Sequence, residues 1–326
     1  MKTLLSTAVI VATIAVSGAS NAQEFTLKLG HDQTDGHPYD LGVERFAEGV
    51  KAATNGAVEI KIYPAGQLGD SAEQIEGLKL GSQDLALAAF SHASQFCKNL
   101  GLFGAPFLFR NDAHFAAVFD GPVADQVDSA CNEQYGIRLQ STFTSGYRLL
   151  FNGKRPVASQ ADLAGLKIRV MGGEADAMTW KVFGAIPAPM PYSEVYSALQ
   201  AGVIDGAENE PASILANKFY ETAQYFTRTN HLVLPMGLFA SDRVMSKLPE
   251  KYRTAIREEA RKAARWQWNF MAERNADALK VMQEKYSVKV ANVDVSIFQA
   301  KGLPIQDMVA KKLGLTDLLA DIRAAK

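Results

Sequence analysis

The sequence lacks the short motifs that mark common catalytic and nucleotide-binding sites. It contains no G-x-S-x-G nucleophile elbow, no P-loop, no G-x-G-x-x-G turn and no H-E-x-x-H zinc motif. Its five histidines include no recognisable set of triad partners. These absences favour a binding protein over a catalyst, and we expect no catalytic residue, no metal and no cofactor.

The net charge is close to zero, and cysteines are few. The 326 residues carry a formal net charge of −1, and 48% are apolar, which fits one large or two medium globular domains. This charge balance gives no indication of nucleic-acid binding, which shows as a basic patch. The two cysteines, Cys97 and Cys131, have no nearby histidines with which to form a zinc site. A disulfide and two buried free thiols both stay open.

Long apolar runs are absent beyond the N-terminus. There, Lys2 precedes the mostly apolar stretch 4–16, and Ser20-Asn21-Ala22 forms a small-x-small cleavage site. The apolar stretch is shorter than the roughly 20 residues that span a bilayer. We therefore predict a signal peptide over residues 1–22, cleaved after about Ala22, and an exported periplasmic protein that does not itself span a membrane.

Strand and helix patterns alternate along the first half of the chain. Apolar and β-branched residues predict strands at 25–29, 58–63 and 84–89, with a helical pattern in each gap. A second unit of the same kind begins near Ser145. The order predicts an α/β fold with a largely parallel sheet.

One helical pattern is much longer than the others. From Pro249 to about Tyr286, apolar residues recur at a spacing near 3.6, interrupted only at Arg274. At about 1.5 Å per residue such a helix is on the order of 50 Å long. It exceeds one small domain, so we expect it to brace two. In the tail, we expect a strand at 288–295 and then helix, broken at 302–304.

The strongest candidate for an anion site is a single arginine on an apolar strand. Residues 166–170 read LKIRV, and alternation places Ile168 and Val170 on one face and Arg169 on the other. A guanidinium in such surroundings needs an anion or water, and its planar fork fits a carboxylate. We propose Arg169 as the anchor of a small-molecule site. The alternatives are a solvated edge strand and an internal arginine–carboxylate pair.

A second arginine lies on the preceding predicted strand. Arg148 falls within the strand predicted at 146–152, whereas Arg155 follows a turn and is expected to be solvated. If the two strands are neighbours, Arg148 and Arg169 can converge on one carboxylate. Each such hydrogen bond contributes roughly 1.5–3 kcal/mol.

Several longer segments together resemble one protein family. They are GLKIRV, MPYSEVYSALQAGVIDGAEN, KFYE, TNH and LP, preceded by YPAGQLGD, GLKLGSQDLAL and PFLFR. In this order they resemble the DctP-type solute-binding protein of TRAP (tripartite ATP-independent periplasmic) transporters, over nearly all of the mature chain. The resemblance implies an α/β two-domain periplasmic-binding-protein clamshell with a long helix spanning both domains. Each domain is then discontinuous: 23–145 plus about 235–274, and 146–234 plus about 275–326.

The resemblance also implies ligand-binding residues. Arg169 matches the family arginine that pairs with the ligand carboxylate, and Arg148 matches a second arginine that is frequently used. Asn209 matches the cleft asparagine, Glu208 is its neighbour, and Tyr192 falls where an aromatic residue often lines the cleft. The first-domain loops that reach the far end of the ligand carry His31, Asp32, Gln33 and Glu73.

The implied function is capture of a small organic acid for a TRAP membrane permease. Sialic acid is disfavoured because Val170-Met171-Gly172 follows Arg169, where sialic-acid binders carry an asparagine. The polar first-domain loops favour a hydroxylated monocarboxylate, such as a uronic or aldonic acid, over a C4-dicarboxylate. One rival is an exported enzyme, for instance a sugar-acid lyase with Glu208 or His31 as general base. Another is a ligand sensor with a membrane partner.

Overall fold

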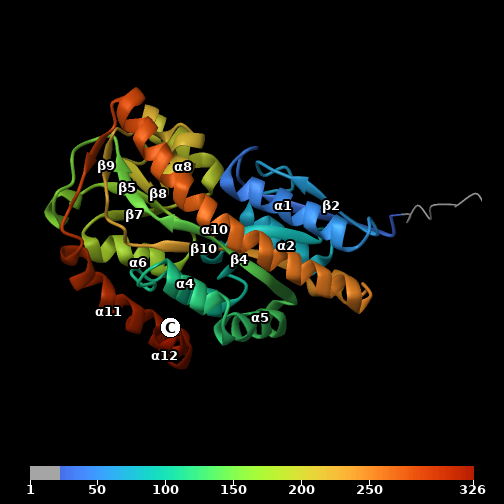
Figure 1. Ribbon diagram of the computed structural model, residues 1–326. Coiled ribbons are helices and arrows are strands. Elements are labelled where there is room, and N and C mark those ends of the chain that lie inside the picture. Colours follow the sequence, from blue (N-terminus) through green and yellow to red (C-terminus); the bar gives the residue numbers. More distant parts are fainter. Residues whose placement is uncertain (1–22) are drawn as a thin grey trace, which may run out of the picture.

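The computed structural model describes residues 23–326, so the predicted signal peptide lies outside the described residues. Two β-sheets organise this part of the chain (Figure 1). The five-stranded sheet has the order β2-β1-β3-β10-β4, and the six-stranded sheet has the order β11-β9-β5-β8-β6-β7. We call the first sheet with the helices packed on it lobe I, and the second with its helices lobe II.

Lobe I follows the predicted β-α-β-α-β order. Its strands β1 and β2, and β1 and β3, pair in parallel, while β10 pairs antiparallel with both β3 and β4. The strands are β1 (Phe25–His31), β2 (Val58–Tyr63), β3 (Leu85–Ala89), β4 (Ile137–Tyr147) and β10 (Val233–Ser241).

Two helices of lobe I begin where polar side chains cap them. Helix α1 (Pro38–Ala53) starts at the N-cap His37, and α2 (Ser71–Leu80) starts at a capping box formed by Asp70 and Glu73. The other helices of lobe I are α3 (Phe90–Ala93), η1 (Lys98–Gly104), α4 (Asp112–Phe119), α5 (Pro122–Tyr135) and α9 (Asp242–Met245).

Lobe II is built on short strands. They are β5 (Leu149–Asn152), β6 (Lys167–Val170), β7 (Ile186–Pro189), β8 (Gly206–Asn209), β9 (Tyr225–Thr227) and β11 (Lys289–Ala291). Strand β7 is an edge strand, as its two prolines predict. The helical segments are η2 (Gln160–Leu163), α6 (Glu174–Phe183), η3 (Tyr192–Glu194), α7 (Val195–Gln200), α8 (Pro211–Ala216) and η4 (Phe219–Glu221).

The chain passes between the lobes more than once. It leaves lobe I between β4 and β5 and returns at β10. Helix α10 (Glu250–Tyr286) then crosses the molecule, packing on α1 and β4 of lobe I and on α8 of lobe II (Figure 1). Its 37 residues confirm the predicted long helix. The numerical domain boundaries stay a prediction.

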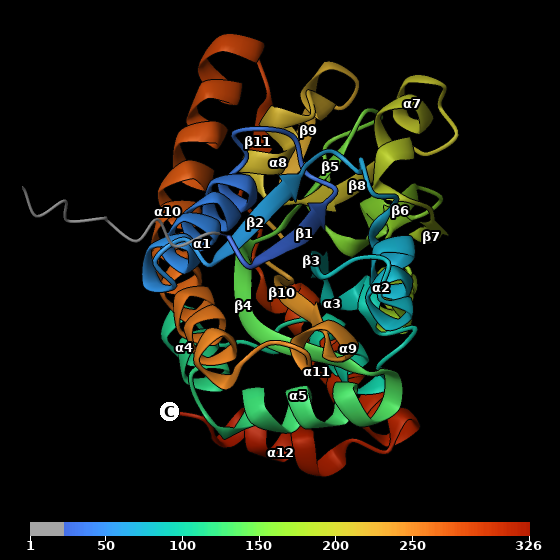
Figure 2. The ribbon, with the colours of Figure 1, turned by 90° about the vertical axis from the view of Figure 1, so that its right-hand side faces the viewer.

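The C-terminal tail differs from the expectation at one proline. Helix α11 (Ser296–Leu313) continues through Pro304, so the predicted break is wrong. The helix survives the lost N–H because it packs on α6 and η1, and Gly302 allows close approach of Phe107. The last helix, α12 (Thr316–Ala324), packs on α5 of lobe I (Figure 2).

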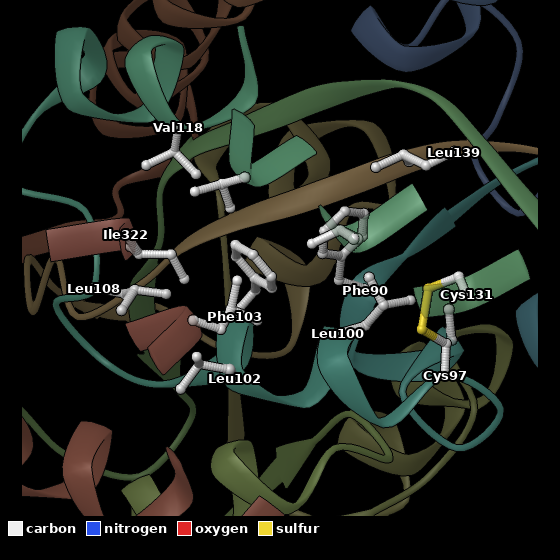
Figure 3. Packing of buried hydrophobic residues seen from close by; sticks show 14 of the residues in the cluster. Phe90, Cys97, Leu100, Leu102, Phe103, Leu108, Val118, Cys131, Leu139 and Ile322 are labelled. Atoms are coloured by element: carbon white, nitrogen blue, oxygen red, sulfur yellow. A yellow bond between two sulfur atoms is a disulfide. The ribbon is translucent and has the colours of Figure 1, made fainter. Parts of the chain in front are cut away.

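A disulfide lies at the edge of the largest apolar cluster. Cys97 and Cys131 are bonded, with their Cα atoms 5.1 Å apart, and join the start of η1 to α5. Figure 3 shows the bond beside Leu100, near Phe90 and Phe103. Of the two alternatives that the sequence left open, the structure therefore has the disulfide. No helix within residues 23–326 combines the length and apolarity required to cross a bilayer.

Candidate functional site

Two neighbouring cavities lie where the lobes meet. The outer cavity, about 580 Å³, is lined by the Asp32 and Asp70–Glu73 loops of lobe I and by the 189–194 segment of lobe II. The inner cavity, about 30 Å³, shares Asp32, His92 and Tyr192 with it and extends to Arg169. A larger cavity, about 650 Å³, runs along α10 and contains none of the predicted site residues.

Arg169 is a buried positive charge without a carboxylate partner. It stands on β6 with 2% of its surface exposed, and its Nε and Nη2 donate to the carbonyl of Met190 at 3.1 and 2.9 Å. Its Cζ lies 5.7 Å from the centroid of the Tyr192 ring. Burial lowers the pKa of Arg169, and no carboxylate of residues 23–326 lies within ion-pair distance of it. Neither the solvated nor the internally paired alternative describes this side chain.

Arg148, by contrast, is neutralised by the protein itself. Its Nε contacts Glu208 Oε2 at 2.5 Å, its Nη1 contacts Glu210 Oε2 at 2.5 Å, and its Nη2 donates to Glu208 Oε1 at 2.9 Å. Burial opposes the charge on Arg148, but the two carboxylates outweigh it and raise the pKa. Arg148 borders the inner cavity. The internal arginine–carboxylate pair considered for Arg169 therefore occurs at Arg148.

The sheet order explains the difference between the two arginines. Arg148 lies between β4 and β5, not within a strand, and β8 separates β5 from β6. The carboxylates of Glu208 and Glu210 thus reach Arg148 from β8 and the residue after it. The sequence predicts that both arginines converge on one carboxylate if their strands are neighbours. The two strands are not neighbours.

Glu208 and His31 line neither cleft cavity. Burial disfavours the charge on Glu208, but Arg148 outweighs it and lowers the pKa to about 2. Its Oε2 also lies 3.4 Å from His231 Nε2. His31 is fully buried, with Nε2 3.1 Å from Asp40 Oδ1. Both residues therefore lie behind the cavity wall, and the predicted direct contacts of Glu208 and His31 with a ligand find no support in this geometry.

The remaining predicted residues lie on the cavity walls. Asn209 Nδ2 donates to the Tyr192 hydroxyl at 3.2 Å, and both line the inner cavity with Arg169. From lobe I, Gln33 lines the inner cavity and Asp32 lines both cavities. Glu73 lies on the outer cavity, where its carboxylate also completes the α2 capping box.

A polar chain joins the lobes beside the inner cavity. The Ser213 hydroxyl of α8 donates to Glu210, and Ser213 Oγ lies 2.9 Å from His37 Nε2 of lobe I. His37 Nδ1 accepts from the Tyr39 N–H at 3.2 Å, so its Nε2 carries the proton and donates to Ser213. Burial is the main cause that lowers the His37 pKa to about 3, which keeps the ring neutral.

Four polar residues that line the inner cavity were not among the predicted ligand contacts: Tyr39, His92, Glu210 and Ser213. Tyr39 follows the apolar pattern of α1, so its spacing indicates core alone. The i, i+2 spacing of Glu208 and Glu210 was a usable signal, because it places two carboxylates on one face of an extended strand. His92 has no sequence pattern that would single it out.

Comparison with known proteins identifies the family. The sequence profile described as bacterial extracellular solute-binding protein, family 7 (DctP) matches residues 29–312. The chain belongs to this family. The profile and the similar proteins thus confirm the TRAP-type solute-binding family that the sequence motifs indicated.

Relatives and solved structures agree over almost the whole chain. A solute-binding protein of Chromohalobacter salexigens is 34% identical over 96% of this chain and 93% of its own length. A TRAP periplasmic solute binding protein from that organism, with bound D-glucuronate, is 33% identical, has a TM-score of 0.87 and covers 92% of this chain and 100% of its own. A sugar acid binding protein from Advenella mimigardefordensis, in complex with galactonate, is 27% identical with a TM-score of 0.87, covering 93% and 99%.

The ion-pair geometry of this solute-binding protein predicts that Arg148 acts mainly on stability. Replacing Arg148 with Met leaves Glu208 and Glu210 buried without a counter-charge, so the free energy of unfolding should fall by about 3–5 kcal/mol in urea denaturation at neutral pH. Arg228→Met, at an exposed arginine of the same lobe, is the control and should change it by no more than about 0.5 kcal/mol. Unchanged stability together with lost ligand binding would instead make Arg148 a ligand contact.

Proposed function

We propose that this protein is the periplasmic substrate-binding subunit of a TRAP transporter. It captures a hydroxylated monocarboxylate, such as a uronic or aldonic acid, and delivers it to a membrane permease. The observation that carries the proposal is Arg169, a buried guanidinium at the meeting point of two lobes with no carboxylate of its own. A ligand carboxylate supplies the missing charge in a bidentate geometry. The sugar acids bound in two similar structures, D-glucuronate and galactonate, support this ligand class.

The outer cavity favours one carboxylate over two. Its described lining includes the carboxylates of Asp32, Asp70, Glu73 and Glu194, with no lysine or arginine. The distal carboxylate of a C4-dicarboxylate would meet like charge there, whereas hydroxyl groups can donate hydrogen bonds to these oxygens. The volume of about 580 Å³ lies within the usual range for small-molecule sites, so a six-carbon acid fits.

The inner cavity is lined by residues of both lobes, and this arrangement favours binding with closure. Arg169, Tyr192 and Asn209 belong to lobe II, whereas Asp32 and Gln33 belong to lobe I. An anion that first engages lobe II gains the lobe I contacts only when the lobes come together. This difference in affinity stabilises the closed state, which is the form that docks on the permease.

The two bases named for the enzyme alternative do not reach the cavity. The two candidates were Glu208 and His31, and both lie behind the cavity walls. Glu208 is ionised against Arg148 with a pKa of about 2, far below the range in which a general base works at neutral pH. These observations support a receptor that releases its ligand unchanged.

A ligand panel separates the receptor from the enzyme. The purified protein is incubated with uronates, aldonates and succinate, and each mixture is examined by calorimetry and by product analysis. We expect stoichiometric binding of a sugar acid, weaker or absent succinate binding, and full recovery of every compound. Turnover of any sugar acid would support the lyase, and binding of none would remove the proposed ligand class.

Replacing Arg169 with Ala should weaken ligand binding with little effect on folding. The lost hydrogen bonds to a carboxylate correspond to at least about 2–3 kcal/mol, or roughly 30- to 150-fold in Kd by calorimetry. Arg155→Ala serves as the matched control because Arg155 is exposed and lies outside both cleft cavities. Unchanged affinity in Arg169→Ala would remove this residue from the site.

Closure predicts a change of shape in solution. Saturating ligand should reduce the radius of gyration measured by small-angle X-ray scattering, because the lobes approach each other around the cavity. Arg169→Ala at the same ligand concentration provides the unliganded reference. Superimposable curves for wild-type protein with and without bound ligand would argue against the clamshell mechanism.

A further inference from the structure

Buried polar atoms without partners gather on one wall of the inner cavity. Within residues 23–326, six buried side-chain atoms have no hydrogen-bond partner, and three of them belong to this wall: Gln33 Oε1, Tyr39 OH and His92 Nδ1. All three residues come from lobe I and share the cavity with Arg169 of lobe II. A buried unpaired polar atom costs about 1–3 kcal/mol, so such atoms are rare and their clustering indicates a ligand contact.

The chemistry of Gln33 defines what the ligand must offer. Its Nε2 donates to Asp32 Oδ1 at 2.9 Å, which leaves Oε1 as an acceptor facing no donor. Asp32 is already partly paired, because Oδ1 accepts from Gln33 and Oδ2 accepts from Ser71 at 2.8 Å, whereas Gln33 Oε1 has no partner at all. The ligand group at Gln33 must therefore be a donor.

Tyr39 and His92 complete a wall suited to a hydroxyl group. Burial, then the nearby Glu210 charge, raises the Tyr39 pKa, so its hydroxyl stays protonated. Burial, followed by the Arg169 charge, lowers the His92 pKa to about 4, so the ring is neutral and offers one donor and one acceptor. A hydroxyl both donates and accepts, so its chemistry matches the acceptor of Gln33 and the donors of Tyr39 and His92. A ring ether or a keto oxygen accepts only and leaves Gln33 unpaired.

The size of the inner cavity places this hydroxyl next to the carboxylate. Its volume of about 30 Å³ admits about two water-sized groups, at about 10–15 Å³ each. If Arg169 holds the carboxylate there, its two oxygens take up about that space, and of the remaining ligand groups a substituent on the adjacent carbon lies nearest to Gln33, Tyr39 and His92. The rest of the ligand continues past Asp32 and Tyr192 into the outer cavity.

We propose that the site selects 2-hydroxy carboxylates, and that Gln33, Tyr39 and His92 are the residues that determine this specificity. The inference rests on the proposed function and narrows its ligand class. An aldonate carries the required hydroxyl on C2. A uronate in its pyranose form has the ring oxygen at the corresponding position. The protein should therefore bind aldonates more tightly than pyranose uronates.

The test compares ligands that differ by one oxygen. Calorimetry measures wild-type protein with D-gluconate, D-galactonate, their 2-deoxy and 3-deoxy analogues, and D-glucuronate. We expect loss of the 2-hydroxyl to weaken binding at least about tenfold, more than loss of the 3-hydroxyl, and glucuronate to bind less tightly than the better aldonate. Equal affinity for the 2-deoxy compound, or preference for glucuronate, would overturn the inference while the proposed function stands. Binding of no sugar acid would overturn the proposed function itself.

Variants then test whether the preference for the 2-hydroxyl comes from the lobe I wall of the inner cavity. Tyr39→Phe and Gln33→Met remove a hydrogen-bonding atom and keep most of the side-chain volume. Each should weaken binding of the 2-hydroxy acid and leave binding of its 2-deoxy analogue nearly unchanged, so that the affinity ratio falls toward one. Tyr147→Phe, which lines the α10 cavity instead, should leave the ratio unchanged. If the ratio of the two affinities is unaltered in both wall variants, these residues do not determine the preference for the 2-hydroxyl. If either variant fails to fold, the ligand series measured with the wild-type protein still decides the inference.

Discussion

A guanidinium removed from water needs negative charge nearby, and this requirement organises the region between the lobes. Arg169 and Arg148 are equally buried, yet the protein meets the requirement in opposite ways. Arg148 has two carboxylates within its own chain, whereas Arg169 has only the carbonyl of Met190 and the face of Tyr192. The positive potential left in the inner cavity therefore comes from Arg169. In the proposed function, the carboxylate of the ligand compensates for this potential.

The neutralised arginine has a structural consequence of its own. With Glu208 and Glu210 it forms a buried ionic cluster, and Ser213 extends this cluster to His37 of lobe I. In this cluster both carboxylates contact the one guanidinium, and the hydrogen bonds among these groups hold the cavity wall in one arrangement. In the proposed function, Arg169 therefore binds the ligand and Arg148 stabilises the wall of the site.

The cleft walls also differ in the ligand groups they accept. The inner cavity combines one unpaired positive charge with unpaired polar atoms of lobe I, whereas the outer cavity is lined by carboxylates. An acid group at one end and hydroxyl groups along the rest match this polarity. The lobe I atoms come from β1, α1 and α3 or the loops beside them, on the opposite side of the cavity from β6. In the proposed mechanism, a single ligand that contacts Arg169 and these lobe I atoms draws the two lobes together.

Local patterns in the sequence were sufficient for the secondary structure that positions this site. Alternation predicted β1, β2 and the Arg169 strand, two prolines predicted the edge strand β7, and the 3.6-residue period predicted α10. These features depend on neighbours within one strand or helix, so a single sequence contains them. The motif resemblance added the family, which the comparisons confirm.

The tertiary structure alone decided which of the two buried arginines is paired with carboxylates of the protein. Sheet order inserts β8 between the strands near Arg148 and Arg169, and nothing in the local pattern of either strand specifies that order. The same holds for Tyr39 and His92, whose sequence positions indicate no more than buried residues, and for Pro304, which stays helical because of contacts with α6 and η1. Each of these outcomes depends on residues far apart in the chain. The sequence by itself therefore determined the helices, the strands and the family, while long-range packing determined how charge is paired and which side chains reach the cavity.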